Sequence, residues 1–263
     1  MPMWSSNGRK IAFVLYPAWP GVGRAHVMDA DGGDLQELTK VGEWSSHPAL
    51  SPRGQRVAFH ALLDGIVNIY IAEAKGGKAV PITNRVDPAG GWRPSSQPAW
   101  SPDGTRIAFV ASKHNNGQAA RYIWAMNPDG SDMRKLVPHE SRNDTPAYSP
   151  NGSRIAFVSD RDGASEIYTI GSDGARLKRV TGMGEARWPR WSPDGTRIVF
   201  HSGPEAGVGG REIYVIDASG RNLKQLTDFG GRSWYADWYD PAADVSARAR
   251  QALMWGWLRR LRQ

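Results

Sequence analysis

The stretch Trp100-Ser101-Pro102-Asp103-Gly104-Thr105-Arg106-Ile107-Ala108-Phe109 decides the fold, because close copies of it recur along the chain. The same pattern begins at Tyr148 and Trp191, and weaker copies begin at Leu50 and Trp4. We call these first residues the anchors. They are spaced 46, 50, 48 and 43 residues apart, and a degenerate sixth anchor, Trp238, follows after 47 more. A repeat of this length is too long for a single-stranded solenoid coil and suits four short strands with their turns.

Each repeat divides into strands in the same way. The strand that ends at the anchor turns through Asp-Gly or Asn-Gly into Ile-Ala-Phe, and such dipeptides tolerate the positive φ of a tight hairpin. A variable loop, a third strand, a glycine turn and a fourth strand ending in Leu-Thr or a similar pair complete the unit. Alternating short strands between glycine turns are typical of antiparallel sheets. We expect third strands at 25–28, 68–71, 122–126, 166–170 and 212–216.

A single four-stranded unit cannot bury both of its faces, so the repeats predict an all-β propeller in which the blades pack face to face around an axis. The Phe of each second strand and the aromatic residue of each third strand are the expected fillers between blades. These third-strand residues are Tyr70, Trp124, Tyr168 and Tyr214. The Asp-Gly turns resemble cation ligands, but turn geometry explains them in every copy.

Composition narrows the classes of function. The 263 residues contain no Cys, which excludes disulfides, cysteine metal sites and a thiol nucleophile. The net charge is +7, but five Arg fall within residues 241–263 and the remaining chain shows no basic stripe. This distribution argues against nucleic-acid binding. No apolar run approaches the roughly 18 residues of a membrane span, and no signal peptide opens the sequence.

The repeated phrase, followed by Ile-Tyr, Asp-Gly and Leu-Thr, resembles the WD-like propeller repeat of the TolB family over about residues 1 to 240. The resemblance implies a propeller domain at 1–241, usually of six blades. Relatives include periplasmic proteins that bind envelope proteins, propellers that gate peptidases, and polysaccharide lyases. The sequence contains five full repeats and a lone strand of a sixth at Trp234 to Tyr239. We therefore expect that about three strands, and a signal peptide, precede Met1 in a longer form of the protein. The alternative is a true five-bladed propeller.

Recognition in propellers falls on loops at the faces and the channel mouth. The residues just before each anchor are rich in the Trp, Tyr and Arg that dominate binding hot spots. We expect them to form a ring at the mouth of the central funnel, either as a binding site for a protein, peptide or sugar or as a packing lid between blades. The candidate site consists of Trp44, His47, Trp92, Gln97, Asp144, Arg187, Trp188, Trp234 and Tyr235.

No catalytic motif is recognisable. The six His lie in different repeats without metal-ligand spacing, and no Gly-x-Ser-x-Gly nucleophile elbow is present. We expect no metal and no cofactor. His47 with Asp144 is the pair that a lyase-type mechanism would use.

Residues 242–263 form a separate segment with the pattern of a basic amphipathic helix. Leu253, Met254, Trp257, Leu258 and Leu261 share one face, and Arg residues occupy the other. Such a helix docks on its own domain or binds a partner or an anionic membrane surface.

The sequence thus predicts a non-enzymatic TolB-like propeller that binds protein or peptide partners through one face of the ring, in the periplasm or outside the cell. The alternative is a carbohydrate-binding or lyase-type propeller that uses the same face.

Overall fold

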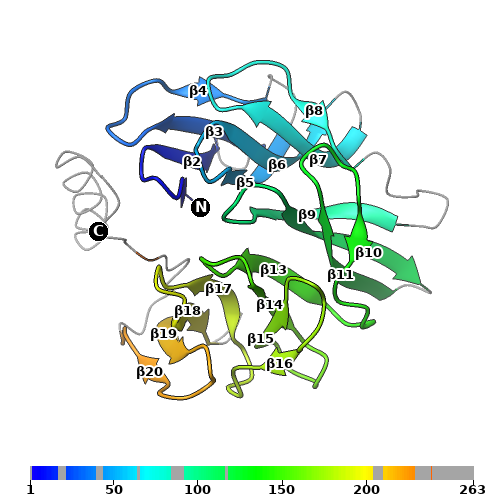
Figure 1. Ribbon diagram of the computed structural model, residues 1–263, viewed down its shortest axis with the longest axis vertical. Helices are drawn as coiled ribbons and strands as arrows, with labels where there is room; N and C mark the ends of the chain where they lie inside the picture. Colours follow the sequence, from blue (N-terminus) through cyan, green and yellow to red (C-terminus); the bar gives the residue numbers. More distant parts are fainter. Residues whose placement is uncertain are drawn as a thin grey trace.

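The computed structural model describes residues 2–16, 22–39, 44–63, 66–83, 92–115, 118–203, 210–228 and 238. These residues form five antiparallel four-stranded sheets arranged as blades around a centre (Figure 1). In each blade the strands lie side by side in chain order, and the strand that ends at the anchor is the innermost. The all-β propeller with four-stranded blades is therefore confirmed.

The twenty described strands follow the predicted order, five times over. Blade 1 contains β1 (Met3–Trp4), β2 (Lys10–Leu15), β3 (Arg24–Asp29) and β4 (Gln36–Glu37), and blade 2 contains β5 (Trp44–Leu50), β6 (Arg56–Leu63), β7 (Ile66–Glu73) and β8 (Val80–Pro81). Blade 3 contains β9 (Trp92–Trp100), β10 (Ile107–Asn115), β11 (Gln118–Met126) and β12 (Arg134–Lys135). Blade 4 contains β13 (Asn143–Tyr148), β14 (Arg154–Ser159), β15 (Glu166–Gly171) and β16 (Lys178–Arg179), and blade 5 contains β17 (Arg187–Trp191), β18 (Arg197–Ser202), β19 (Glu212–Asp217) and β20 (Lys224–Gln225).

The Ser-Pro-Asp-Gly phrase forms the hairpin between the first two strands of a blade. In blade 3 the Ser101 hydroxyl donates to Asp103 at 2.5 Å and accepts the Arg106 amide at 2.9 Å. Gly104 adopts a φ of +73°, which only glycine reaches without steric cost. The recurring carboxylate thus accepts hydrogen bonds within the turn and stabilises it, as predicted.

The core lies between neighbouring blades. The second-strand Phe residues 59, 109, 157 and 200 are fully buried. The rings of Phe59, Phe157 and Phe200 face those of Tyr70, Tyr168 and Tyr214 across the strand pair, at centroid distances of 6.1, 6.0 and 5.8 Å. In blade 1 His26 takes the place of the tyrosine, 5.6 Å from Phe13. Phe59 and Tyr70 also belong to one cluster with Ala12 and Val27 of blade 1, which confirms the predicted packing between blades. The predicted filler Trp124, in contrast, is only half-buried at the edge of its cluster.

A tryptophan staple joins successive blades. The indole nitrogens of Trp100 and Trp191 each donate at 3.0 Å to the carbonyl one residue before the anchor of the preceding blade, namely Ala49 and Ala147. Trp238 makes the same bond to Arg190, at 3.2 Å. The Arg56 guanidinium lies 5.0 Å from the Trp100 ring, and the Arg197 guanidinium lies 5.1 Å from the Trp238 ring.

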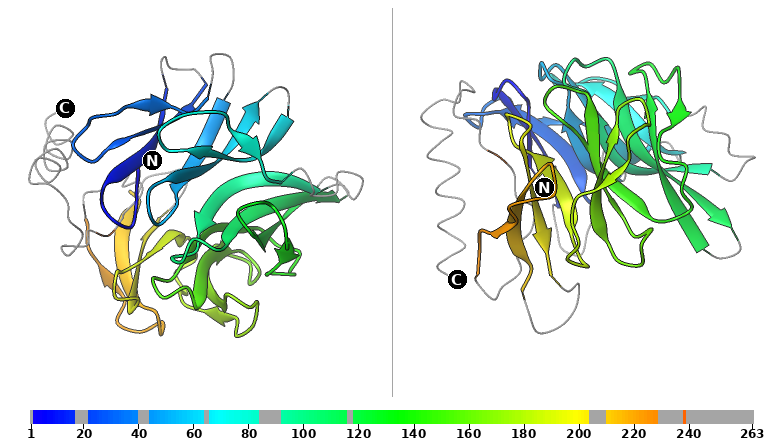
Figure 2. Two further views of the ribbon diagram at one scale, coloured as in Figure 1. Left: turned by 45° about the horizontal axis from the view of Figure 1, so that its top comes forward. Right: turned by 60° about the horizontal axis from the view of Figure 1, so that its bottom comes forward.

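The ring is open on one side within the described residues. The inner strands β1, β5, β9, β13 and β17 pack in succession, but β17 and β1 form no comparable interface. Figure 1 shows blades 1 and 5 at the two ends of the row of blades, and in both views of Figure 2 these blades, blue and yellow to orange, lie on the same side of the molecule. Apart from Trp238, the predicted strand at 234–239 and the predicted helix at 242–263 lie outside the described residues. Within the described part, no helix is long and apolar enough to span a membrane.

Candidate functional site

The inner strands of four blades carry a bulge immediately before a proline. The strand pairings shift register between Ser46 and Ala49, and likewise between Asp144 and Ala147. The same irregularity interrupts β9 and β17. A β-bulge redirects the side chain at the irregularity. The residues at the four bulges are His47, Gln97, Thr145 and Trp188.

These four residues have left-handed backbone conformations, with φ of 51°, 62°, 53° and 57°. A non-glycine residue in this region costs about 1–2 kcal/mol. A following proline restricts the preceding residue to extended conformations, which makes the geometry still less favourable. Four other non-glycine residues adopt this conformation in turns, namely Asp34, Asp132, Arg176 and Asn222. The bulge residues differ from them because their side chains point to a common place, which favours a functional role.

All four side chains line the central channel, a cavity of about 500 Å³. This volume lies within the range of ligand-binding pockets. The His47 and Trp188 rings stack with centroids 5.9 Å apart and planes 7° from parallel. Because β5 and β17 are not neighbours in the ring, this stack crosses the channel.

The side chains of Gln97, His47 and Thr145 differ in whether their polar atoms have a hydrogen-bond partner. Gln97 Oε1 accepts the Thr145 backbone amide at 2.7 Å, which links β9 to β13. His47 Nδ1 lies 2.9 Å from Ser46 Oγ. Thr145 Oγ1 is buried, and it has no hydrogen-bond partner within the described part of the chain. The channel thus offers two stacked rings, an amide and a hydroxyl to a ligand.

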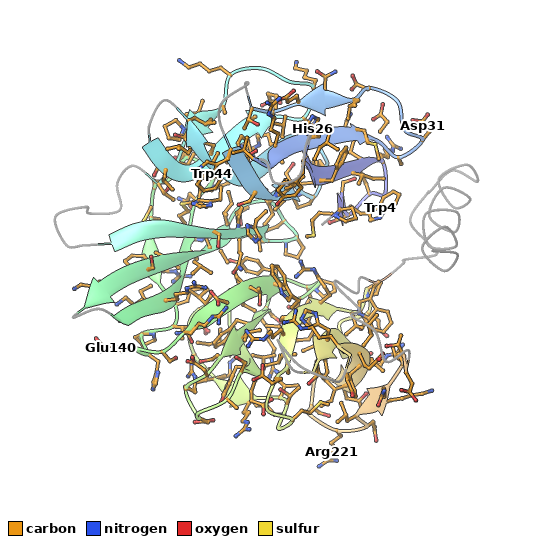
Figure 3. All side chains as sticks on the ribbon, turned by 180° about the vertical axis from the view of Figure 1, so that it is seen from behind. Trp4, His26, Asp31, Trp44, Glu140 and Arg221 are labelled. Atoms are coloured by element: carbon orange, nitrogen blue, oxygen red, sulfur yellow. The ribbon has the colours of Figure 1, made fainter. Side chains whose placement is uncertain are left out.

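The other predicted site residues lie elsewhere. Trp44 packs edge-on against His60 at 4.9 Å and does not line the channel. Figure 3 shows Trp44 on blade 2, away from the open side of the ring where Trp4 lies. Arg187 Nη2 donates to Glu185 Oε2 at 2.9 Å. Trp92 begins β9, and its side chain lies outside the described residues, as do Trp234 and Tyr235.

Asp144 is a structural ion-pair centre. Its buried carboxylate accepts from Arg121 Nη1 at 3.0 and 2.9 Å and from Arg142 Nε at 2.5 Å. Two guanidinium groups therefore occupy the oxygens that an acid–base pair with His47 would use. No group of three His, Asp or Glu side chains that could hold a metal occurs among the residues described.

The sequence did not identify part of the channel wall. The anchors and the prolines of the Ser-Pro turns, interpreted as scaffold, line the same cavity as the bulges. These residues are Trp4, Leu50, Trp100, Tyr148 and Trp191 with Pro52, Pro102, Pro150 and Pro193. The recurrence of a proline two residues before the anchor was the available signal for the bulges, and it would also have identified Thr145.

Two histidines, the half-buried His47 and the fully buried His201, predict acid sensitivity. Burial lowers the pKa of His47 to about 4, and burial together with Arg211 and Arg187 lowers the pKa of His201 to about 4. An unfolded imidazole binds its proton near pH 6.5, so as the pH falls from about 6.5 to 4 the unfolded chain gains protons first. We expect each residue to remove about 1.4 kcal/mol of stability at pH 5.5 relative to pH 7.5. Urea unfolding at both pH values measures this loss. Replacing both residues with Gln should flatten the dependence, and an unchanged dependence in that variant would contradict the assignment.

Comparison with known proteins also indicates a propeller fold. The fold and its channel define a β-propeller built from WD-like repeats. A family model described as the TolB beta propeller domain matches residues 93–227. The chain therefore belongs to the TolB β-propeller family.

Two relatives are similar to this chain in sequence. An uncharacterized protein of Agrobacterium fabrum is 31% identical over 209 residues, which are 76% of this chain and 64% of that protein. The Tol-Pal system protein TolB of Francisella tularensis subsp. holarctica is 30% identical over 73% of this chain and 44% of its own length. The match thus spans less than two thirds of either relative.

Solved structures give the same result. A putative TolB from Agrobacterium tumefaciens superposes with a TM-score of 0.69 at 25% identity, covering 86% of this chain and 79% of that one. An oligogalacturonate lyase in complex with manganese superposes with a TM-score of 0.62 at 17% identity, over 85% of this chain and 63% of its own, and shares the fold alone.

Proposed function

We propose that this chain is a non-enzymatic binding protein that holds a protein partner at the bulge ring of its channel, His47, Gln97, Thr145 and Trp188. The observation that carries the proposal is the repeated left-handed conformation at these four positions. The four side chains that this conformation directs also meet in one cavity, which is what distinguishes them from left-handed residues in turns.

The chemistry of the ring suits a polypeptide ligand. Stacked His47 and Trp188 rings offer apolar faces, and Trp is among the residues most enriched in binding hot spots. Thr145 Oγ1 and the Gln97 amide can exchange hydrogen bonds with a peptide backbone. Since Asp144 is held by two arginines, the described residues support recognition better than acid–base catalysis.

The relatives suggest the kind of partner. TolB of Francisella tularensis carries the name of the Tol-Pal system, so we propose Pal, or an envelope protein of the same kind, as the partner. This proposal places the protein in the periplasm.

Calorimetric titration of the purified chain with the soluble domain of Pal encoded in the same genome tests the proposal. We expect saturable one-to-one binding, and we expect an oligogalacturonide to produce no heat under the same conditions. Binding of the sugar without binding of the protein would overturn the assignment, and so would the absence of both.

A further inference from the structure

A groove between blades 3 and 4 adjoins the channel. It has a volume of about 580 Å³, within the range of ligand-binding pockets, and lies among the Ser-Pro turns of these neighbouring blades (Figure 1). Tyr148, Pro102 and Pro150 line both the groove and the channel. The two cavities therefore meet at these residues, and a polypeptide held in the channel can continue into the groove.

The anchor of blade 4 explains why this junction is open. In blades 3 and 5 the anchors Trp100 and Trp191 donate to a carbonyl of the preceding blade, and they are only 8% and 9% exposed. Blade 4 carries the smaller Tyr148 at this position, and Tyr148 is half-buried. Its hydroxyl forms no hydrogen bond with any residue that the structure describes. The groove thus lies where other junctions are closed by an indole.

The arginine six residues after the preceding anchor is also drawn away from the Tyr148 ring. At the junction of blades 2 and 3, Arg56 lies 5.0 Å from the Trp100 ring. The equivalent Arg106 donates instead to Asn127 Oδ1 at 2.8 Å and to Asp132 Oδ2 at 2.5 Å. No guanidinium among the described residues therefore covers the Tyr148 ring, which is available to a ligand.

Arg134 supplies the charge of the groove. It is exposed on β12, and its hydrogen bond within the described part of the chain runs from Nη2 to the Ser172 carbonyl at 3.3 Å. Arg106 is paired with Asp132, and the Asp103 carboxylate accepts hydrogen bonds within its own turn. Arg134 is thus the cation that the groove offers to a ligand, and it favours an acidic group.

Tyr148 supplies a hydrogen-bond donor as well as an aromatic face. Burial raises the pKa of Tyr148 to about 12, so its hydroxyl stays protonated at neutral pH. Pro102 and Pro150 add apolar surface beside it. These groups suit an extended polypeptide, because a backbone carbonyl can accept from the hydroxyl while side chains pack on the rings.

We propose that a protein partner held at the bulge ring continues into the groove between blades 3 and 4, where its chain packs on Tyr148 and one of its acidic side chains pairs with Arg134. This inference rests on the proposed function and adds the path and the charge of the bound segment. The partner segment is therefore acidic next to the residues that occupy the channel.

Charge reversal at two equivalent positions tests the role of Arg134. Lys178 is the matched control, because it occupies the equivalent place on β16, is also exposed, and donates to the Ser219 carbonyl of the next blade at 2.7 Å. It lines neither the groove nor the channel. Arg134→Glu and Lys178→Glu change the net charge equally. In calorimetric titration with the soluble domain of Pal, we expect Arg134→Glu to weaken binding at least about fivefold and Lys178→Glu by less than about twofold.

Tyr148→Trp tests the path of the partner. The substitution introduces the anchor residue of blades 3 and 5, so we expect the variant to fold and to melt within a few degrees of the parent. Because the larger indole occupies the groove where it meets the channel, affinity for the Pal domain should fall at least about fivefold.

Two results would overturn this proposal alone. Equal affinities of the Arg134→Glu and Lys178→Glu proteins, weakened or not, would show that the groove does not recognise an acidic group. Binding by Tyr148→Trp as tight as that of the parent would show that the partner does not pass through the groove. In both cases binding by the parent chain leaves the proposed function intact. A parent chain that does not bind the Pal domain would overturn the proposed function and this inference together.

Discussion

Replacing Phe157 with Ala should cost about 3–5 kcal/mol of unfolding free energy, the range for deleting a buried aromatic side chain. Phe157 is fully buried between blades 3 and 4, in a cluster with Ile123, Ala125 and Leu136. Its neighbours are strands of two separate sheets, which cannot collapse easily into the cavity. For a domain whose total stability is about 5–15 kcal/mol, the loss is large.

Leu177→Ala in the same blade is the matched control. Leu177 is 47% exposed, and a surface change of this kind alters stability by about 0.5 kcal/mol or less. Urea unfolding of both variants at pH 7.5 separates them. Equal midpoints for the two variants would contradict the inter-blade core as the main source of stability.

Replacing Trp188 with Ala should weaken partner binding by at least about 2 kcal/mol, or roughly 30-fold, because Trp188 has the composition and central position of a hot spot. The ring stacks across the channel on His47 and is half-buried, so its removal opens the binding surface without emptying a blade core. We therefore expect a melting temperature within a few degrees of the parent. Calorimetric titration with the partner measures the loss of affinity.

Trp44→Ala is the control for this prediction. Trp44 is also half-buried and also contacts a histidine ring, but it lies outside the channel. Its removal should leave affinity unchanged. A Trp188→Ala protein that loses its cooperative melting would instead support the packing-lid interpretation, and Gln97→Ala then tests the binding role independently.

The repeated phrase was sufficient to predict most of the fold. Turn residues such as Gly104 act locally, so their positive φ follows from the Asp-Gly dipeptide itself. The Phe157–Tyr168 pair follows from the register of neighbouring strands, whereas Glu166–Gly171 is buried on both faces and shows no alternation of burial. These features need no knowledge of distant contacts.

The site was less predictable, because it arises from four strands that meet only in three dimensions. The sequence indicated His47, Gln97 and Trp188 by residue type, but Thr145 looked ordinary until the bulge placed it in the channel. In the sequence Asp144 looked functional because no local pattern reveals its structural partner. That partner, Arg121, belongs to β11 of the preceding blade. The stack of His47 on Trp188 joins residues that are far apart in sequence and belong to blades that are not adjacent.

Hydrogen–deuterium exchange of the chain with and without bound partner locates the binding surface directly. If the bulge ring holds the partner, protection concentrates in the bulges, at residues 46–49, 96–99, 144–147 and 187–190. Protection confined to the outer strands, or to the Ser-Pro-Asp-Gly hairpins with unchanged exchange at the bulges, would contradict it.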